Sequence, residues 1–250
     1  MLRYIGSAIA LLALVGCAGV PPMPTTSVDD LKKGKTAVVF YDGAQKIHYV
    51  EDKYYVLAIA KVATESTYDG FWDSHRDLSR IHAAEFSRIG LRAQAAYDAL
   101  SQHELTEFLN AQKQMSAATL VGEVPFSKIL KPKHRVELMA KGYDHLIWIT
   151  WLGYHLYIPA LGLPPTHSFQ ASYVIHNLKR NTTVWQGSIA FRDQVEIPGA
   201  SAKAYLEGND MAGLRSVVTK LIKDRYTIRP DAGGYSKSVG QFLGIEPLGD

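Results

Sequence analysis

From residue 35 onward, the hydrophobic positions of the chain fall into short runs typical of strands and longer stripes typical of helices. Runs rich in β-branched and aromatic residues predict strands over 35–41, 46–50, 54–63, 145–152, 168–178 and 182–191. The last two flank the polar turn Lys179-Arg180-Asn181 and predict a β-hairpin. Alanines weaken the strand pattern of 54–63, which leaves open that this run begins a helix instead.

Apolar residues at helical spacing predict three helical regions. Between Asp77 and Lys113 they mark one broken helix or two consecutive helices, which continue through 91–100. Ser101 and Glu104 have the spacing of a capping box, which marks the start of a helix. A short helix is predicted to end at Gly142, and a last one to run from Asp210, as its cap, to Tyr226.

The order of these elements is strands, long helix, short helix, strand, hairpin and helix. This order predicts an α/β or α+β fold with helices packed on a mixed sheet of about five strands. We expect one globular domain over 34–228 and a loose tail over 229–250, within which Phe242, Leu243 and Ile245 could dock.

Residues 1–16 have a different pattern from the rest of the chain. Arg3 precedes an uncharged apolar run over 5–15, which is 11 residues long. A membrane-spanning helix needs about 20 residues, whereas a run of this length is typical of a signal peptide. We therefore expect 1–16 to be a signal peptide that is removed.

The segment Leu14-Val15-Gly16-Cys17 resembles the lipobox of bacterial lipoproteins, residue for residue. The resemblance implies that a diacylglycerol is attached to Cys17, that the chain is cut before Cys17, and that its new amino group is acylated. Several acyl chains give stable anchoring in a membrane. The alternatives are that Cys17 ends an ordinary signal peptide or packs in a buried helix.

Residues 17–33 are predicted to form a tether, because Pro21, Pro22 and Pro24 disfavour both helix and central strand. An extended proline-rich tether of about 15 residues reaches up to ~45 Å. Ala18 follows the cysteine where enterobacterial lipoproteins retained in the inner membrane carry aspartate. By that resemblance we expect the outer membrane, with the domain facing the periplasm.

Composition and motifs exclude several classes of function. The chain has 250 residues, a formal net charge of +3 and one cysteine, so it holds neither an intramolecular disulfide nor a CxxC site. Its basic residues form no stripe, and we expect no nucleic-acid partner. The sequence contains no HExxH, GxSxG, Walker A or GxGxxG motif. We therefore expect no cofactor, no metal and no enzymatic activity.

One polar cluster leaves a metal site open as an alternative. It consists of Asp69, Asp73, His75, Asp77 and His82. Carboxylates and imidazoles at this density can bind a divalent cation. The favoured interpretation is a helix N-terminus capped by Asp73 or Ser74, because two turns of helix, about 10 Å, separate the two histidines.

The 18 residues 146–163 carry no formal charge. Glycines and a proline interrupt them, so we interpret the segment as a buried strand followed by an apolar loop rather than a membrane span. An exposed apolar loop indicates a contact surface for a partner. The candidate contact residues of this loop are Tyr154, Leu156, Tyr157, Ile158, Leu161 and Leu163.

Two short patterns resemble a group of periplasmic lipoproteins. The first is Ala140, Gly142, Tyr143 and Asp144 before an apolar run, and the second is VWQG over 184–187. The group includes the curli secretion lipoprotein, the penicillin-binding-protein activator lipoprotein and relatives of the TolB N-terminal domain.

These observations favour a non-catalytic outer-membrane lipoprotein that binds an envelope protein or helps to assemble an envelope complex. The resemblance to the curli secretion lipoprotein implies, as an alternative, an oligomeric secretion or pore component. A second alternative is an envelope hydrolase or metal-binding protein that uses the cluster between Asp69 and His82.

Overall fold

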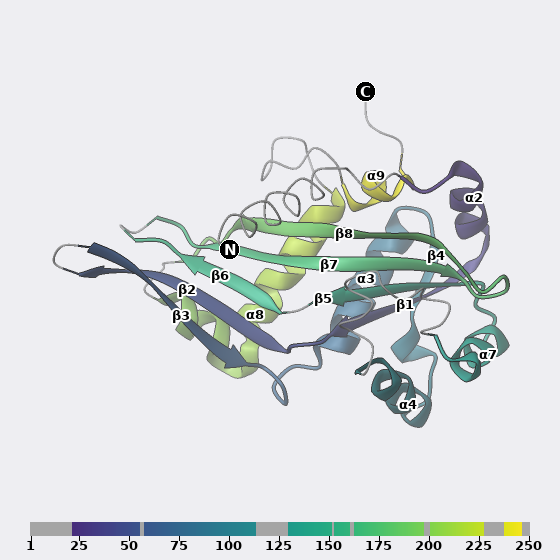
Figure 1. Ribbon diagram of the computed structural model, residues 1–250, viewed down its shortest axis with the longest axis horizontal. Coiled ribbons are helices and arrows are strands. Elements are labelled where there is room, and N and C mark those ends of the chain that lie inside the picture. Colours follow the sequence, from purple (N-terminus) through teal and green to yellow (C-terminus); the bar gives the residue numbers. More distant parts are fainter. Residues whose placement is uncertain are drawn as a thin grey trace, which may run out of the picture.

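The structure is a computed structural model that describes residues 22–55, 58–113, 130–151, 153–160, 163–197, 201–227 and 238–246. A mixed sheet of eight strands forms its centre, with helices packed on it (Figure 1). The predicted α/β architecture is confirmed, with more strands than the expected five.

The strands are β1 Lys35–Asp42, β2 Lys46–Tyr55, β3 Ala58–Thr67, β4 Arg92–Ala95, β5 His145–Trp151, β6 Tyr154–Ile158, β7 Thr166–Asn177 and β8 Thr182–Gln194. The helices are α2 Thr25–Lys33, α3 Ser74–Arg88, the 3₁₀ helix η1 Ala96–Asp98, α4 Gln102–Lys113, α7 Pro132–Ala140, α8 Ala202–Thr227 and α9 Val239–Leu243.

Two pairs of strands, β1 with β2 and β5 with β6, each follow one another end to end along the sheet and so act as one long composite strand. β5 and β6 pair one after the other with the same edge of β7, while β8 pairs with its other edge. From the pair Trp151–Ala171 to the pair His155–Ser168, the chain advances four residues along β5 and β6 but only three along β7. The extra residue is a β-bulge at Gly153, whose φ is +105°. β1 and β2 run parallel to β5 and β6 in the same way. As a result, β2, β3 and β6 extend one end of the sheet (Figure 1).

Both faces of the sheet are covered around β1 and β5, which explains why all seven residues of β5 are buried. On one face, Phe40 and Ile149 pack in a cluster with Phe86 of α3 and Leu214 of α8. On the other face, Trp148 packs in a cluster with Phe108 of α4 and Leu138 of α7. Alternation along each strand sends successive side chains to these two cores.

The predicted helix over 91–100 is wrong. Gly90, with φ +96°, ends α3, and the Leu91 N–H donates to the carbonyl of Phe86 at 3.0 Å. The chain then extends as β4 and pairs in parallel with β1. The predicted capping box is confirmed, because the Ser101 N–H donates to Glu104 Oε2 at 2.6 Å and the Glu104 N–H to Ser101 Oγ at 3.3 Å.

The last long helix starts earlier than expected and is interrupted. α8 begins at Ala202, and its backbone leaves the helical region over 208–211. Asp210, the expected cap, has φ 52° and lies within this break. The apolar face predicted after it is buried, including Leu214, Val218 and Ile222.

The folded domain extends beyond both of its predicted bounds, residues 34 and 228. Part of the expected tether, 25–33, is helix α2, which buries Val28 and Leu31. Part of the expected loose tail is helix α9, which buries Leu243. The N–H of Met23 donates to the Leu243 carbonyl at 3.3 Å, so the two ends meet. The predicted signal peptide, Cys17 and residues 18–21 lie outside the described residues.

The Gly-Tyr-Asp pattern before β5 has a structural explanation. Gly142 adopts φ +81°, which favours glycine after α7. The side chain of Asp144 then accepts from the Lys35 N–H at 2.9 Å and pairs with Lys179 at 2.6 Å. Lys179 first, and then the Lys35 N–H, lower the pKa of Asp144. This carboxylate therefore joins the start of β1 to the turn after β7.

Candidate functional site

The predicted partner-contact loop is instead strand β6. Tyr154, Leu156 and Ile158 are buried in the core, because the composite strand continues past Gly153. Tyr157 is half-buried and donates to Asp52 Oδ2 at 2.5 Å. Of the candidate contact residues, Leu163 is exposed at 58%, and Leu161 lies outside the described residues. Deleting this segment would remove an inner strand of the sheet.

The acidic and histidine cluster is divided between different environments. Asp73 caps α3, where its side chain accepts from the Arg76 N–H at 3.2 Å. His82 is completely buried, stacks on Phe40 and shares a hydrogen bond with the Tyr226 hydroxyl at 2.9 Å. Among the described residues, no three His, Cys, Asp or Glu side chains gather as ligands for a metal ion.

A buried carboxylate at the end of β1 was not singled out from the sequence. Asp42 is 2% exposed and accepts hydrogen bonds from the hydroxyls of Tyr68 and Ser74. Its other oxygen accepts from the N–H groups of Ala44 at 3.2 Å and Gln45 at 2.8 Å. With both oxygens occupied, Asp42 holds together the ends of β1 and β3 and the start of α3.

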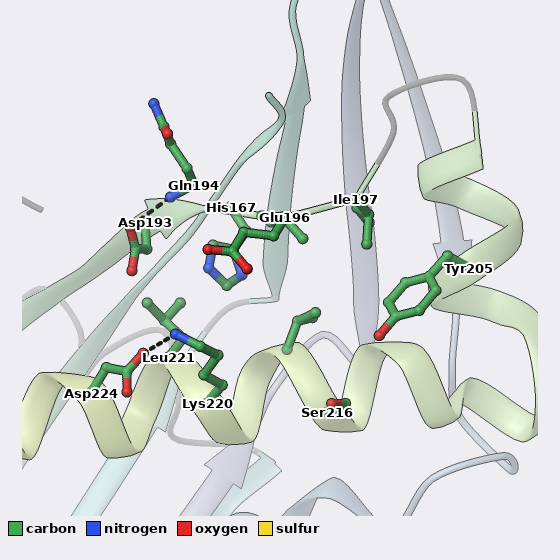
Figure 2. Close-up of a pocket in the computed structure, with 12 residues that line it drawn as sticks. His167, Asp193, Gln194, Glu196, Ile197, Tyr205, Ser216, Lys220, Leu221 and Asp224 are labelled. Carbon is green, nitrogen blue, oxygen red and sulfur yellow. Dashed lines mark hydrogen bonds and ion pairs between the residues drawn. The ribbon is translucent and has the colours of Figure 1, made fainter. Parts of the chain in front are cut away.

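A pocket of about 330 Å³ lies between the end of β8 and helix α8 (Figure 2). This volume is within the range of small-molecule and side-chain binding sites. The hairpin β7–β8 supplies one wall and successive turns of α8 supply the other. The lining residues are His167, Asp193, Gln194, Val195, Glu196, Ile197, Tyr205, Ser216, Val217, Lys220, Leu221 and Asp224.

His167 is the most deeply placed polar group of the pocket. It is 4% exposed, and its Nδ1 shares a hydrogen bond with the Tyr154 hydroxyl at 2.9 Å. Burial lowers the pKa of His167 to about 4, so its imidazole is neutral near pH 7. Burial also raises the pKa of Tyr154 well above its usual value.

Charged groups surround the mouth of the pocket, and the negative ones are in excess. Lys220 pairs with Asp224 at 2.5 Å, one turn further along α8. Its bond to Asp224, together with the charges of Asp224, Asp193 and Glu196, raises the pKa of Lys220. Three carboxylates therefore face one ammonium group, which makes the pocket favourable for a second cation.

The pocket lacks an evident catalytic arrangement among the described residues. His167 at pKa about 4 is a weak base at neutral pH. Ser216, a hydroxyl of the lining, has no hydrogen bond to a base within the described ranges. The arrangement is suited to binding a cationic group.

The sequence offered only indirect signs of this pocket. Lys220 and Asp224 have the i,i+4 spacing of a helical ion pair. Asp193 and Glu196 follow the predicted hairpin in the polar segment 192–196. These residues line one pocket only because α8 crosses the end of β8. The local sequence pattern of either element does not predict that crossing.

No protein-family model matches the chain, and no curated protein matches it. Within the described residues, no helix is long and apolar enough to cross a membrane.

Three solved structures show a low similarity. Lipoprotein GNA1162 from Neisseria meningitidis covers 77% of this chain and 98% of its own, with 14% identity and a TM-score of 0.31. The hypothetical protein CT253 from Chlamydia trachomatis covers 73% and 85%, with 14% identity and a TM-score of 0.36. The LpoB C-terminal domain from Salmonella enterica covers 65% and 90%, with 8% identity and a TM-score of 0.27. One of these neighbours is thus described as a lipoprotein, and TM-scores this low carry no conclusion about function.

Proposed function

We propose that the protein is a non-catalytic module of the bacterial envelope, anchored in the outer membrane by lipid on Cys17, that binds a partner protein in the periplasm. The observation that carries the binding role is the excess of carboxylates around the pocket between β8 and α8. The group proposed to enter it is a lysine or arginine side chain of the partner.

The lining of the pocket fits both the aliphatic stem and the cationic end of a lysine or arginine side chain. Val195, Val217 and Leu221 offer apolar contact to an aliphatic stem. The carboxylates of Asp193 and Glu196 offer charge-assisted hydrogen bonds to its cationic end. A neutral His167 adds no repulsion, and it can accept at Nε2 when its Nδ1–H is donated to the Tyr154 oxygen.

The anchoring role rests on the sequence. The lipobox at Leu14-Val15-Gly16-Cys17 supplies the attachment point, and Ala18 favours the outer membrane over retention in the inner one. The folded part then starts no later than residue 22, which is the first described residue.

The binding proposal is tested with Nα-acetyl-lysine amide, followed by chemical shifts of backbone amides. We expect saturable binding on the order of 1 mM, centred on α8 and the end of β8. Nα-acetyl-norleucine amide, which lacks the charge, is expected to bind at least about tenfold more weakly, because it makes no charge-assisted bonds. Raising the salt concentration should weaken only the binding of the lysine probe.

Matched variants locate this binding. Glu196→Gln and Asp193→Asn are each expected to weaken lysine-probe binding about tenfold. Asp69→Asn removes the same charge from an exposed turn outside the pocket and should leave binding unchanged. Equal binding of the lysine and norleucine probes, or no binding of either, would show that the pocket does not select a cation. A photocrosslinking residue at Tyr205, which is 44% exposed at the pocket, then identifies the partner in intact cells.

Lipid attachment is tested by Cys17→Ala. We expect an uncleaved precursor that takes up no alkyne-labelled fatty acid, because the modified sulfur and the residue at the cleavage site are both lost. Wild-type chain should be labelled and shorter by intact mass. Labelling that persists in the variant would contradict the anchor.

A further inference from the structure

Strand β3 is the last strand at one edge of the sheet. It forms ten consecutive pairs with β2 and, within the described part of the chain, none on its other side. Figure 1 shows the β2–β3 hairpin reaching beyond the helices at one end of the molecule. Each described side chain of β3, from Ile59 to Thr67, is at least partly exposed.

The usual features that protect an edge strand are sparse here. Edge strands are commonly shielded by proline, bulges or several charged residues. The sequence of β3, AIAKVATEST, contains no proline, and its pairing with β2 has no register shift. It carries one lysine and one glutamate, Lys61 and Glu65, on the same face of the strand.

These two charges make the edge complementary to itself. In an antiparallel pair of two β3 strands centred on Ala63, Lys61 of each chain lies opposite Glu65 of the other. We infer that β3 pairs with β3 of a second copy in this register, forming a two-fold symmetric dimer with a continuous sheet. The occupant is a second copy because one strand supplies both members of both ion pairs.

Other registers of the same pairing are less favourable. Centring the pair on Lys61 sets lysine against lysine, and centring it on Glu65 sets glutamate against glutamate, which is destabilising. Within one chain, Lys61 lies 3.6 Å from Asp52 and Glu65 lies 2.8 Å from Lys46. The side chains of Lys61 and Glu65 nevertheless remain 67% and 51% exposed, so both can contact a second chain.

One introduced cysteine tests whether two β3 strands pair in this register. In full-length chain carrying Cys17→Ala, Ala63→Cys would face its own copy across the two-fold axis. Directly opposed residues have Cα atoms about 4.5–5.5 Å apart, which suits a disulfide. We expect mild oxidation to yield a covalent dimer. Thr67→Cys is the matched control on the same exposed strand, because its two copies would lie about 27 Å apart in this register.

Charge reversal tests the ion pairs. Lys61→Glu alone gives two glutamates facing each other in both pairs, and Glu65→Lys alone gives two lysines. We expect each variant to dimerise at least about tenfold more weakly than wild type in light scattering, because opposed like charges are destabilising. An equimolar mixture restores both opposite-charge pairs and should recover the dimer.

The outcomes separate this inference from the proposed pocket. Dimer recovery only in the mixture, with cross-linking at Ala63→Cys but not Thr67→Cys, supports it. A monomeric wild type, cross-linking of both cysteines, or a mixture no more dimeric than its components would overturn it. Binding of the lysine probe at α8 is measured separately and does not depend on the result. Circular dichroism of each variant confirms that the comparison is between folded chains.

Discussion

Asp42→Ala is expected to lower the free energy of unfolding by about 4 kcal/mol. The substitution leaves two hydroxyls and two backbone N–H groups without their acceptor, and those of Tyr68 and Ser74 are in the buried interior. An orphaned buried donor costs about 1–3 kcal/mol, and water relieves the cost for the more exposed ones. Urea unfolding followed by circular dichroism measures the loss.

Two controls identify the cause of this loss. Tyr68→Phe removes the hydroxyl donor and its hydrogen bond to Asp42 but leaves no buried donor without an acceptor. We therefore expect the free energy of unfolding to fall by only about 1 kcal/mol. Asp69→Ala changes an exposed carboxylate nearby, and its effect should stay within about 0.5 kcal/mol. If Asp42→Ala cost no more than Asp69→Ala, Asp42 would not organise the end of β1.

Lowering the pH from 7 to 5 is expected to destabilise the protein by about 4 kcal/mol through two buried histidines. Burial lowers the pKa of His82 to about 3 and that of His167 to about 4, whereas an unfolded histidine titrates near 6.5. Below pH 6.5 the unfolded chain therefore binds protons that the folded chain excludes. Stability is fully present above pH 6.5 and is lost as the pH falls toward the folded pKa, at about 2 kcal/mol per histidine by pH 5.

A double variant separates the two contributions. His82→Phe with Tyr226→Phe removes the titrating ring together with its hydroxyl partner and keeps an aromatic ring against Phe40. This variant should lose about 2 kcal/mol less than wild type between pH 7 and pH 5, because His82 no longer titrates. The measurement is urea unfolding at both pH values. An equal loss in wild type and variant would show that His82 does not cause the acid sensitivity.

Local patterning predicted the elements whose signals lie within a few residues. The β7–β8 hairpin, the buried strand β5 and the Ser101–Glu104 capping box are all confirmed. Each depends on alternation, on an apolar run or on a fixed three-residue spacing.

The errors arose where distant parts of the chain decide the structure. Residues 92–95 have helix-forming composition but pair with β1, because Gly90 turns the chain onto the open edge of that strand. The segment 154–158 was expected to belong to a loop, yet it continues β5 past a bulge and gains partners on both sides. The acidic pocket was missed for the same reason, since its two walls are joined only in the folded chain.

Helix α2 changes the expected distance between the domain and its membrane, because it takes up part of the predicted tether. Helix α2 lies at the end of the sheet opposite the β2–β3 hairpin (Figure 1), and Met23 is bonded to the end of α9. Only residues 18–21 separate Cys17 from the first described residue, and five steps of extended chain span at most about 18 Å. With lipid on Cys17 as proposed, the segment between the lipid and the domain is shorter than the ~45 Å expected for a fully extended tether over 17–33. The α2 end of the domain would then rest near the bilayer, and the open edge of β3 would project furthest into the periplasm.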